Sequence, residues 1–367
     1  MTNTNNSGVG SLRQATLDTN SSPPGPHTIN FSISGCGLVC TISPILVGFT
    51  LSGGNTTING RSQPGSVPAT ATTPTTPMIE INGSATDNHS CLNISSSGNV
   101  IRGLAINRCT AHGVYIFGSG ATGNRLSGNL IGTNYNGFSD SPNKFSGVFI
   151  GSGAQGNTLG GSDVSDRNLI SGNNRSGVEI SGLGTINNVV SGNFIGTDAG
   201  GAIRLGNVQD GIHITTNAKN STVGHNNLIA FNGGDGVRVD TPTTNGHSVR
   251  GNRIFQNDGL GINLTNGGNG DLPAPVIQST AFGSIHISGT ACAGCTVEVF
   301  SSRIPDGEGE FYLGYTTADA SGSFSLVVGG LPSPYLTATA TREPGTSKFS
   351  APFTSTAYLL HLPAILR

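Results

Sequence analysis

The chain has 367 residues, of which 57 are glycine, only 10% are charged and none is tryptophan. Its formal net charge of −2 gives no electrostatic basis for binding nucleic acid or an anionic membrane surface. The absence of any run of about 20 apolar residues excludes a transmembrane helix. A chain of this length is long enough for two domains.

The N-terminal segment predicts a short helix that closes one end of the fold. Ser11 and Gln14 have the spacing of a capping box, and Leu12 and Ala15 lie on one face of the helix that follows. A short amphipathic helix is a suitable lid for the apolar end of a repeat fold. The first strand is predicted from the alternation of Ile29, Phe31 and Ile33.

One short phrase recurs through the centre of the chain: Gly, then Val or Ile, any residue, then Ile or Val. Its copies begin at Gly113, Gly147, Gly177, Gly211, Gly236 and Gly259. The spacing falls from 34 residues (113 to 147) to 23 (236 to 259). A repeat near 23 residues with inserts in its turns predicts the coils of a right-handed parallel β-helix.

Two further phrases give each coil three short strands. One is Asn-x-Ile, and the other is a Val or Leu shortly before a glycine, as at Leu126 and Val190. Because equivalent positions in adjacent coils lie about 4.8 Å apart, the asparagines predict hydrogen-bonded ladders that satisfy turn backbone groups. One predicted column contains Asn129, Asn168, Asn193, Asn227 and Asn252, and the other contains Asn134, Asn173, Asp198, Asn232 and Asn257.

The N-terminal motif and the ends of the coils resemble a known family. Thr2-Asn3, the run from Ser7 to Ala15, and Gly-Asn-x-Ile-Gly-Thr at 128–133 and 192–197 are similar to secreted bacterial right-handed parallel β-helix repeat proteins. The resemblance covers residues 2 to about 270 and implies a fold similar to that of pectate lyases. It implies a surface or adhesion protein and does not imply a particular activity.

The pattern changes after residue 270. Alternating strands and turn signals about every ten residues predict a small immunoglobulin-like β-sandwich. The predicted organisation is all-β: an N-terminal cap with irregular first coils (1–90), regular coils (91–270), the sandwich (271–356) and an apolar tail (357–367). The Pro/Thr-rich stretch 62–77 is predicted as a surface loop.

The six cysteines form three local pairs, which predicts disulfides and a secreted, oxidising setting. The short spacings of the first and third pairs could also indicate a zinc site, but this interpretation is weaker because no further His or Cys accompanies them. No signal peptide precedes Thr2, so Met1 is expected to begin a mature or recombinant form. The predicted bridges are Cys36 with Cys40, Cys91 with Cys109, and Cys292 with Cys295.

The first candidate site is a row of outward side chains on the sheet formed by the Gly-Val-x-Ile copies. Val and Ile point inward, so the residue between them points outward. Tyr115 and Phe149 are predicted to stack on sugar rings, and Glu179, His213 and Arg238 to bind ligand or supply acid/base chemistry. A solvated, non-functional face is the alternative. With Asn93 at its start, the predicted row is Asn93, Tyr115, Phe149, Glu179, His213 and Arg238.

A second row precedes the glycines and contains three carboxylates; its members are His112, Ser146, Ser176, Asp210, Asp235 and Asp258. Three stacked carboxylates repel unless something compensates. Three alternatives stay open: ordinary turn residues, a Ca²⁺ site, or a catalytic carboxylate pair that uses Asp210 and Asp235. The chain lacks the Asn-Thr-Asp and adjacent Asp-Asp of polygalacturonase-like enzymes.

The preferred interpretation is a secreted or cell-surface structural or adhesive β-helix protein that binds glycan and self-assembles, with no cofactor apart from the optional Ca²⁺. The alternative is a polysaccharide lyase, glycoside hydrolase or epimerase that acts through the outer face of the first sheet. Catalysis needs a groove with walls, and the inserts at 132–145 and 196–209 are the candidate walls. The apolar tail is a candidate for packing on its own domain or for assembly into an oligomer or filament.

Overall fold

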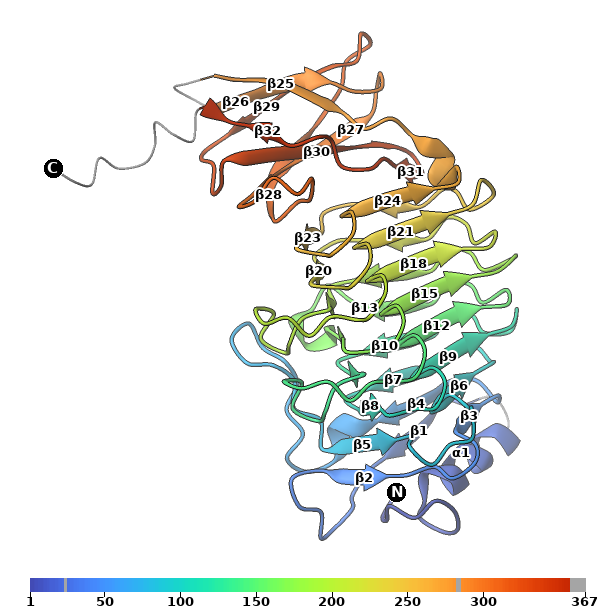
Figure 1. Ribbon diagram of the computed structural model, residues 1–367. Helices are drawn as coiled ribbons and strands as arrows, with labels where there is room; N and C mark the ends of the chain where they lie inside the picture. Colours follow the sequence, from blue (N-terminus) through green and yellow to red (C-terminus); the bar gives the residue numbers. More distant parts are fainter. Residues whose placement is uncertain (23–24, 282–284, 357–367) are drawn as a thin grey trace, which may run out of the picture.

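The computed structural model describes residues 1–22, 25–281 and 285–356. A stack of coils rises from the N-terminus to a small β domain at the other end (Figure 1). Each coil contributes one strand to each of three parallel sheets of eight strands. The fold is the predicted all-β architecture, a parallel β-helix followed by a β-sandwich. Among the described residues, no helix has both the length and the apolar character of a membrane span.

Within the β-helix, every third strand along the chain belongs to the same sheet. Sheet A contains β1 (His27–Asn30), β4 (Thr56–Asn59), β7 (Val100–Arg102), β10 (Arg125–Ser127), β13 (Thr158–Gly160), β16 (Val189–Ser191), β19 (Thr222–Val223) and β22 (Ser248–Val249). Sheet B contains β2 (Cys40–Ile42), β5 (Ile79–Asn82), β8 (Ala105–Asn107), β11 (Leu130–Ile131), β14 (Leu169–Ile170), β17 (Phe194–Ile195), β20 (Leu228–Ala230) and β23 (Arg253–Phe255). Sheet C, built from the Gly-Val-x-Ile copies, contains β3 (Phe49–Leu51), β6 (Leu92–Ile94), β9 (Val114–Phe117), β12 (Val148–Gly151), β15 (Val178–Ser181), β18 (Ile212–Thr215), β21 (Val237–Asp240) and β24 (Ile262–Thr265).

The interior is a column of stacked Val, Ile and Leu side chains. Val178 pairs with Val148 in the coil below and with Ile212 in the coil above, and all three are fully buried. β-branched residues fit this environment because they pack well on a pleated surface. Successive residues point to opposite faces, so Glu179, next to Val178, points away from the core.

The register of the last copy of the phrase differs from the prediction by two residues. Ile262, and not Leu260, pairs with Val237, and Leu260 is 46% exposed. The copy therefore begins at Gly261. The sequence offers both Gly259 and Gly261, and both approach other groups closely: a Cβ on Gly261 would lie 2.8 Å from the ring of Phe349 in the sandwich, and one on Gly259 would lie even closer to the Asp235 carboxylate.

The predicted lid is present as α1 (Leu12–Ser21). Ser11 is its N-cap and accepts a hydrogen bond from the Gln14 N–H, while Leu12 is fully buried in the core of the stack. Arg13 donates to the carbonyl oxygens of Gly48 and Val47, which fixes the helix beside β3. The lid thus covers apolar surface that the first coil would otherwise expose.

Asparagine ladders run along the corners of the stack. The first predicted column is confirmed, because the amide of each member donates to the side-chain oxygen of the next, from Asn129 through Asn168, Asn193 and Asn227 to Asn252. The sequence did not reveal an additional ladder, which runs from Asn99 through Asn124 and Asn157 to Asn188. The same side-chain oxygens also accept backbone N–H groups of the turns, which satisfies donors that would otherwise be buried unpaired.

The second predicted column is wrong at two positions. Its members are Asn143, Asn173, Asn207, Asn232 and Asn257. Asn143 and Asn207 replace Asn134 and Asp198. The side chain of Asn134 accepts the N–H of Phe138, and that of Asp198 accepts the N–H of Ala202, so both close the turns of the inserts instead.

The inserts 132–145 and 196–209 lie on the outer face of sheet B. A Cβ on Gly137 would lie 2.6 Å from Ala199 and 3.0 Å from Leu169, so the turn of one insert contacts both its neighbour and the sheet. The loop at 62–77 reaches the same face, where Ala69 and Pro74 lie beside Leu130 and Leu169. The turns of the inserts therefore cover sheet B and do not wall a groove on sheet C, although Phe145, the last residue of the first insert, contacts His112 beside the sheet C row.

The C-terminal domain packs two antiparallel sheets face to face. One contains β25 (Val276–Ala281), β26 (Ile285–Thr290) and β29 (Ser323–Val328). The other contains β27 (Thr296–Ser302), β28 (Phe311–Thr317), β30 (Tyr335–Arg342), β31 (Gly345–Thr346) and β32 (Phe353–Thr354). Both sheets contribute buried apolar residues to one core, as a sandwich requires. The predicted tail, 357–367, lies outside the described residues.

The sandwich also closes the C-terminal end of the stack. Gly309 forms a backbone bridge with Ile254 at the end of sheet B, and the Thr346 hydroxyl accepts the N–H of Val249 at the end of sheet A. The Glu308 carboxylate accepts two hydrogen bonds from Asn257, at 3.0 Å and 3.3 Å, and so terminates a ladder. The two domains are joined by these specific contacts.

All three predicted disulfides are formed. Cys36 is bonded to Cys40, Cys91 to Cys109, and Cys292 to Cys295. The Cys91–Cys109 bridge spans 18 residues, with its Cα atoms 5.5 Å apart, and lies wholly in the buried core.

Candidate functional site

The register of sheet C brings the predicted outward row together. Tyr115 pairs with Phe149, Phe149 with Glu179, Glu179 with His213, and His213 with Arg238. The row is therefore continuous across β9, β12, β15, β18 and β21 (Figure 1). Each of the five side chains is half-buried, because its neighbours above and below cover its flanks.

The aromatic end of the row is a cluster. The rings of Tyr115 and Phe149 meet edge to face at 5.3 Å, and Tyr115 also stacks on Phe117 at 4.6 Å. His112 lies 4.8 Å from Phe149 and 5.3 Å from Phe145. Burial lowers the pKa of His112 to about 4, so its imidazole is neutral at physiological pH. These rings hold one another in place and present a fixed apolar surface.

The charged end of the row has two carboxylates with defined partners. Glu179 Oε2 accepts a hydrogen bond from the Ser146 hydroxyl at 2.8 Å. Asp210 Oδ2 lies 4.0 Å from Nδ1 of His213, at the distance limit of an ion pair. Arg238 lies 3.6 Å from Asp240 in the same strand. Asp210 and Asp240 flank the row and place a negative charge beside His213 and Arg238, which offsets the cost of stacking two basic side chains.

Two nitrogens at this end are buried without a hydrogen-bond partner among the described residues. They are Nε2 of His213 and Nε of Arg238. Burial raises the pKa of the Asp210 carboxyl, the N–H of Asp235 and the charge of His213 oppose the shift, and the nearby Asp235 carboxyl adds to it. A carboxyl that holds its proton more tightly beside an imidazole is an arrangement suited to proton transfer.

The second predicted row is correct for Asp210 and Asp235 but wrong for Asp258. Asp210 accepts the N–H of Asp235, and Asp235 accepts that of Leu260, so both carboxylates bond turn backbone of the next coil. Leu260 occupies the third place because of the two-residue shift of the last copy. Asp258 forms an exposed ion pair with Arg204 instead.

The predicted Ca²⁺ site of Asp210, Asp235 and Asp258 is not assembled. The residues that the structure describes contain no group of three or more His, Cys, Asp or Glu side chains placed to hold a metal ion. One carboxylate oxygen of Asp235 instead accepts a hydrogen bond from the Leu260 N–H, and the other accepts one from the Asn263 side chain. Hydrogen bonds from the turn backbone and from Asn263 compensate the two stacked carboxylates.

A hollow lies at the N-terminal end of the row, where α1 contacts sheet C. Its volume is about 340 Å³. Thr50 and Asn93 precede Tyr115 in the register, and both line this hollow together with Arg13 and Asn20 of the helix. A wall on sheet C is therefore supplied by the lid, which the sequence analysis had assigned only a capping role.

The outer face of sheet B carries an apolar row that was not expected from the sequence. The middle residue of Asn-x-Ile gives an apolar row there, from Leu130 through Leu169 and Phe194 to Leu228. Arg167 lies over the Phe194 ring, with its guanidinium carbon 4.1 Å from the ring centroid. The signal was the apolar character of the middle residue, since a solvated strand face would carry polar residues there.

No protein-family model matches the chain, and no curated relative was found. Among solved structures, the periplasmic alginate epimerase AlgG is similar over 70% of each chain, with 15% identity and a TM-score of 0.28. Its T265N mutant matches over 66% of each chain, with 15% identity and a TM-score of 0.28. Tailspike protein 2 of bacteriophage CBA120 is similar over 98% of this chain and 77% of its own enzymatically active domain, with 12% identity and a TM-score of 0.24. At these scores the likeness carries no argument about function.

Proposed function

We propose that this chain is a secreted or cell-surface β-helix protein that binds a polysaccharide along the outer face of sheet C. The supporting observation is the continuous row in which Tyr115 and Phe149 adjoin Glu179, His213 and Arg238. Aromatic rings stack on the apolar faces of sugars, and charged groups form the stronger hydrogen bonds to their polar groups. A row that crosses five strands suits a linear polymer better than a small molecule, because it spans roughly 20 Å.

The three disulfides support an oxidising location, since such bonds persist mainly outside the cytosol. The stack also supports a structural or adhesive role. Its ends are closed by α1 and by the sandwich, which leaves long side faces for contact with other molecules (Figure 1). Self-assembly through 357–367 stays a prediction, because that segment lies outside the described residues.

The test is a glycan-array screen, followed by affinity measurements on the double variant Tyr115→Ala/Phe149→Ala. We expect the loss of most glycan binding with a small change in melting temperature, because the half-buried cluster lies outside the core. Phe138→Ala is the matched control, since this aromatic residue is 52% exposed on the insert over sheet B. Binding that survives in the double variant contradicts the proposal for sheet C.

Acid/base chemistry on the same polysaccharide is a second candidate function. It is favoured by the raised pKa of Asp210, which lies 4.0 Å from His213 beside the cation of Arg238. Proton transfer at a sugar carbon next to a carboxylate needs an acid/base pair and a nearby positive charge to stabilise the negative charge that develops.

This candidate is tested by incubating the protein with the glycans that it binds, with reducing ends and unsaturated products measured over time. Asp210→Asn should abolish any turnover, while Asp258→Asn should leave it unchanged because Asp258 pairs with Arg204 away from the row. Binding without either product in the unaltered protein would exclude hydrolysis and elimination at sheet C.

A further inference from the structure

A second concave site lies on sheet B, where the β-helix meets the sandwich. We call it the interdomain pocket; its volume is about 630 Å³. Its floor follows the register from Phe194 to Leu228 to Arg253 across β17, β20 and β23. Residues of the sandwich form the opposite side. The principal lining residues are Arg167, Phe194, Leu228, Arg253, Phe311 and Tyr312.

The pocket is preformed, because specific bonds hold the two domains on either side of it. Ile254 of β23 forms a backbone bridge with Gly309, and Nε of Arg253 donates to the Glu310 carbonyl oxygen at 3.1 Å. The N–H of Gly251, which also lines the pocket, donates to the buried Glu298 carboxylate at 3.0 Å. A ligand would therefore meet a site that needs little reorganisation.

Two cations line this pocket without an anionic partner. Among the described residues, neither Arg167 nor Arg253 has a carboxylate within ion-pair distance. By contrast, several arginines elsewhere on the molecule are paired, as with Asp166, Glu298 and Glu310. Burial lowers the pKa of Arg167 from its usual value, so its charge is partly desolvated and would gain from an anion.

The remaining walls offer ring surfaces. Arg167 already lies over Phe194, Phe311 has the Arg303 guanidinium 5.3 Å from its ring, and Tyr312 is 42% exposed. Burial raises the pKa of Tyr312 to about 12, so its phenol remains a neutral hydrogen-bond donor. Aromatic faces next to a phenol and guanidinium groups match a ligand that has both a ring and an acid group.

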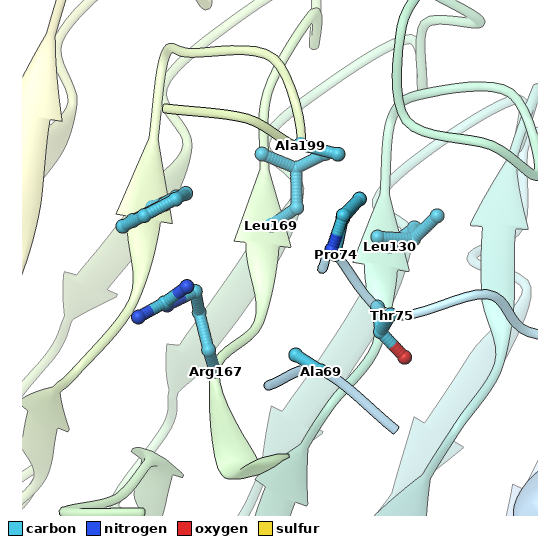
Figure 2. A pocket seen from close by; sticks show the side chains of 8 residues that line it. Ala69, Pro74, Thr75, Leu130, Arg167, Leu169 and Ala199 are labelled. Carbon is cyan, nitrogen blue, oxygen red and sulfur yellow. The ribbon is translucent and has the colours of Figure 1, made fainter. Parts of the chain in front are cut away.

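A narrow apolar hollow under the inserts adjoins the pocket at Arg167. Figure 2 shows Arg167 beside Leu169 on one side of this hollow, with Ala69, Pro74 and Thr75 of the loop 62–77 on the other. Arg167 and Phe194 line both spaces. The unpaired guanidinium therefore stands at the junction, with the larger space toward the sandwich.

We propose that the interdomain pocket binds an anionic saccharide, with Arg167 and Arg253 binding its acid groups and Phe194, Phe311 and Tyr312 contacting its rings. Phe194 and Arg253 are two strands apart on the floor, which is roughly 10 Å. Because the Arg167 guanidinium lies over Phe194, the two cations are separated by a similar distance, which suits acid groups on different sugars of one chain and not a single small anion. The site is separate from the row on sheet C, and its occupancy does not depend on the function proposed there.

The test uses the full chain and three tetrasaccharides of equal length: an oligouronate, a sulfated oligosaccharide and a neutral oligoglucose, each titrated by calorimetry. We expect an anionic tetrasaccharide to bind at least roughly tenfold more tightly than the neutral one, with an affinity that falls as salt rises. The uronate and sulfate arms distinguish which acid group is preferred. Equal affinity for all three, or no binding by any, overturns the proposal.

Arg167→Gln and Arg253→Gln should each weaken the anionic tetrasaccharide by roughly tenfold or more, since each removes one charge-assisted contact. Arg204→Gln is the matched control, because that arginine is exposed and already paired with Asp258. Arg167→Lys keeps the charge and should keep part of the affinity even if Arg167→Gln folds poorly. Unchanged binding in both Gln variants overturns the proposal, whereas loss only in Tyr115→Ala/Phe149→Ala would place all binding on sheet C.

Discussion

The outer faces of sheets B and C belong to the same coils and have the same parallel backbone, yet they differ in what covers them. On sheet B the outward row is apolar from Leu130 to Leu228, and the inserts lie over much of it. On sheet C the outward row changes from aromatic at Tyr115 to charged at Arg238 and is half-buried. The inward residues thus define the coil, while the outward residues decide whether a face becomes a second core or a contact surface.

The largest expected effect comes from inward substitutions, for which sheets B and C should behave alike. Val178→Asp on sheet C and Ile195→Asp on sheet B each place an unpaired charge at a fully buried inward position. Both should prevent folding, at a cost of several kcal/mol or more. The measurement is soluble yield and circular dichroism. Soluble protein with unchanged melting behaviour for either variant would contradict the register.

Outward substitutions should separate the faces. Leu169→Ala on sheet B should cost about 2–5 kcal/mol, because this leucine is only 3% exposed beneath an insert. Glu179→Ala lies ten residues later in the same coil and should cost no more than about 1 kcal/mol, since it loses one hydrogen bond to Ser146. Denaturant unfolding measures both. Equal costs would show that the faces are equivalent.

Glu308, at the C-terminal end of the stack, should make the stability of the fold depend on pH. Burial raises the pKa of Glu308 to about 8 in the folded chain, against an ordinary value near 4.5. Between these values the native state holds one more proton than the unfolded state, so this group makes stability fall as pH rises, by about 1.4 kcal/mol per pH unit. Glu308→Gln should remove that slope between pH 6.5 and 8.

The window above pH 6.5 is chosen because His247 acts in the opposite sense below it. Burial lowers its pKa to about 4, so between about pH 4 and 6.5 the unfolded state holds the extra proton and stability rises with pH. Thermal melts of both proteins across pH 6.5–8 provide the measurement. Parallel curves for the parent chain and Glu308→Gln would show that Glu308 is ionised throughout.

The smallest expected effect tests the corrected register. Asp258→Ala should change stability by less than about 1 kcal/mol, because its ion pair with Arg204 is exposed at both ends. Asp235→Ala should cost more, since its carboxylate accepts the N–H of Leu260 and a bond from Asn263. If Asp258 belonged to the same row as Asp235, the two variants would behave alike.

The coil strands, the lid, the first ladder and the row on sheet C could be predicted because each depends on local periodicity. Prediction failed where two equally suitable residues compete and distant packing decides. Asn143 occupies the ladder position predicted for Asn134, whose side chain closes the turn of the insert, and the last copy of the phrase begins at Gly261 although Gly259 also fits the pattern. The interdomain pocket joins Arg167 to residues more than a hundred positions away, so no local pattern could indicate it.

The ladders have a consequence for the length of the molecule. Within a ladder, every asparagine except the last donates in the same direction to an identical amide one coil further on, often 25 residues away, as from Asn207 to Asn232 to Asn257. Coils within a ladder therefore join through the same Asn–Asn hydrogen bond. Insertion or deletion of one whole coil there would leave the remaining asparagines able to form that bond with their new neighbours. The distance from the lid to the sandwich then changes in steps of about 4.8 Å. The number of coils thus sets the separation between the lid and the sandwich.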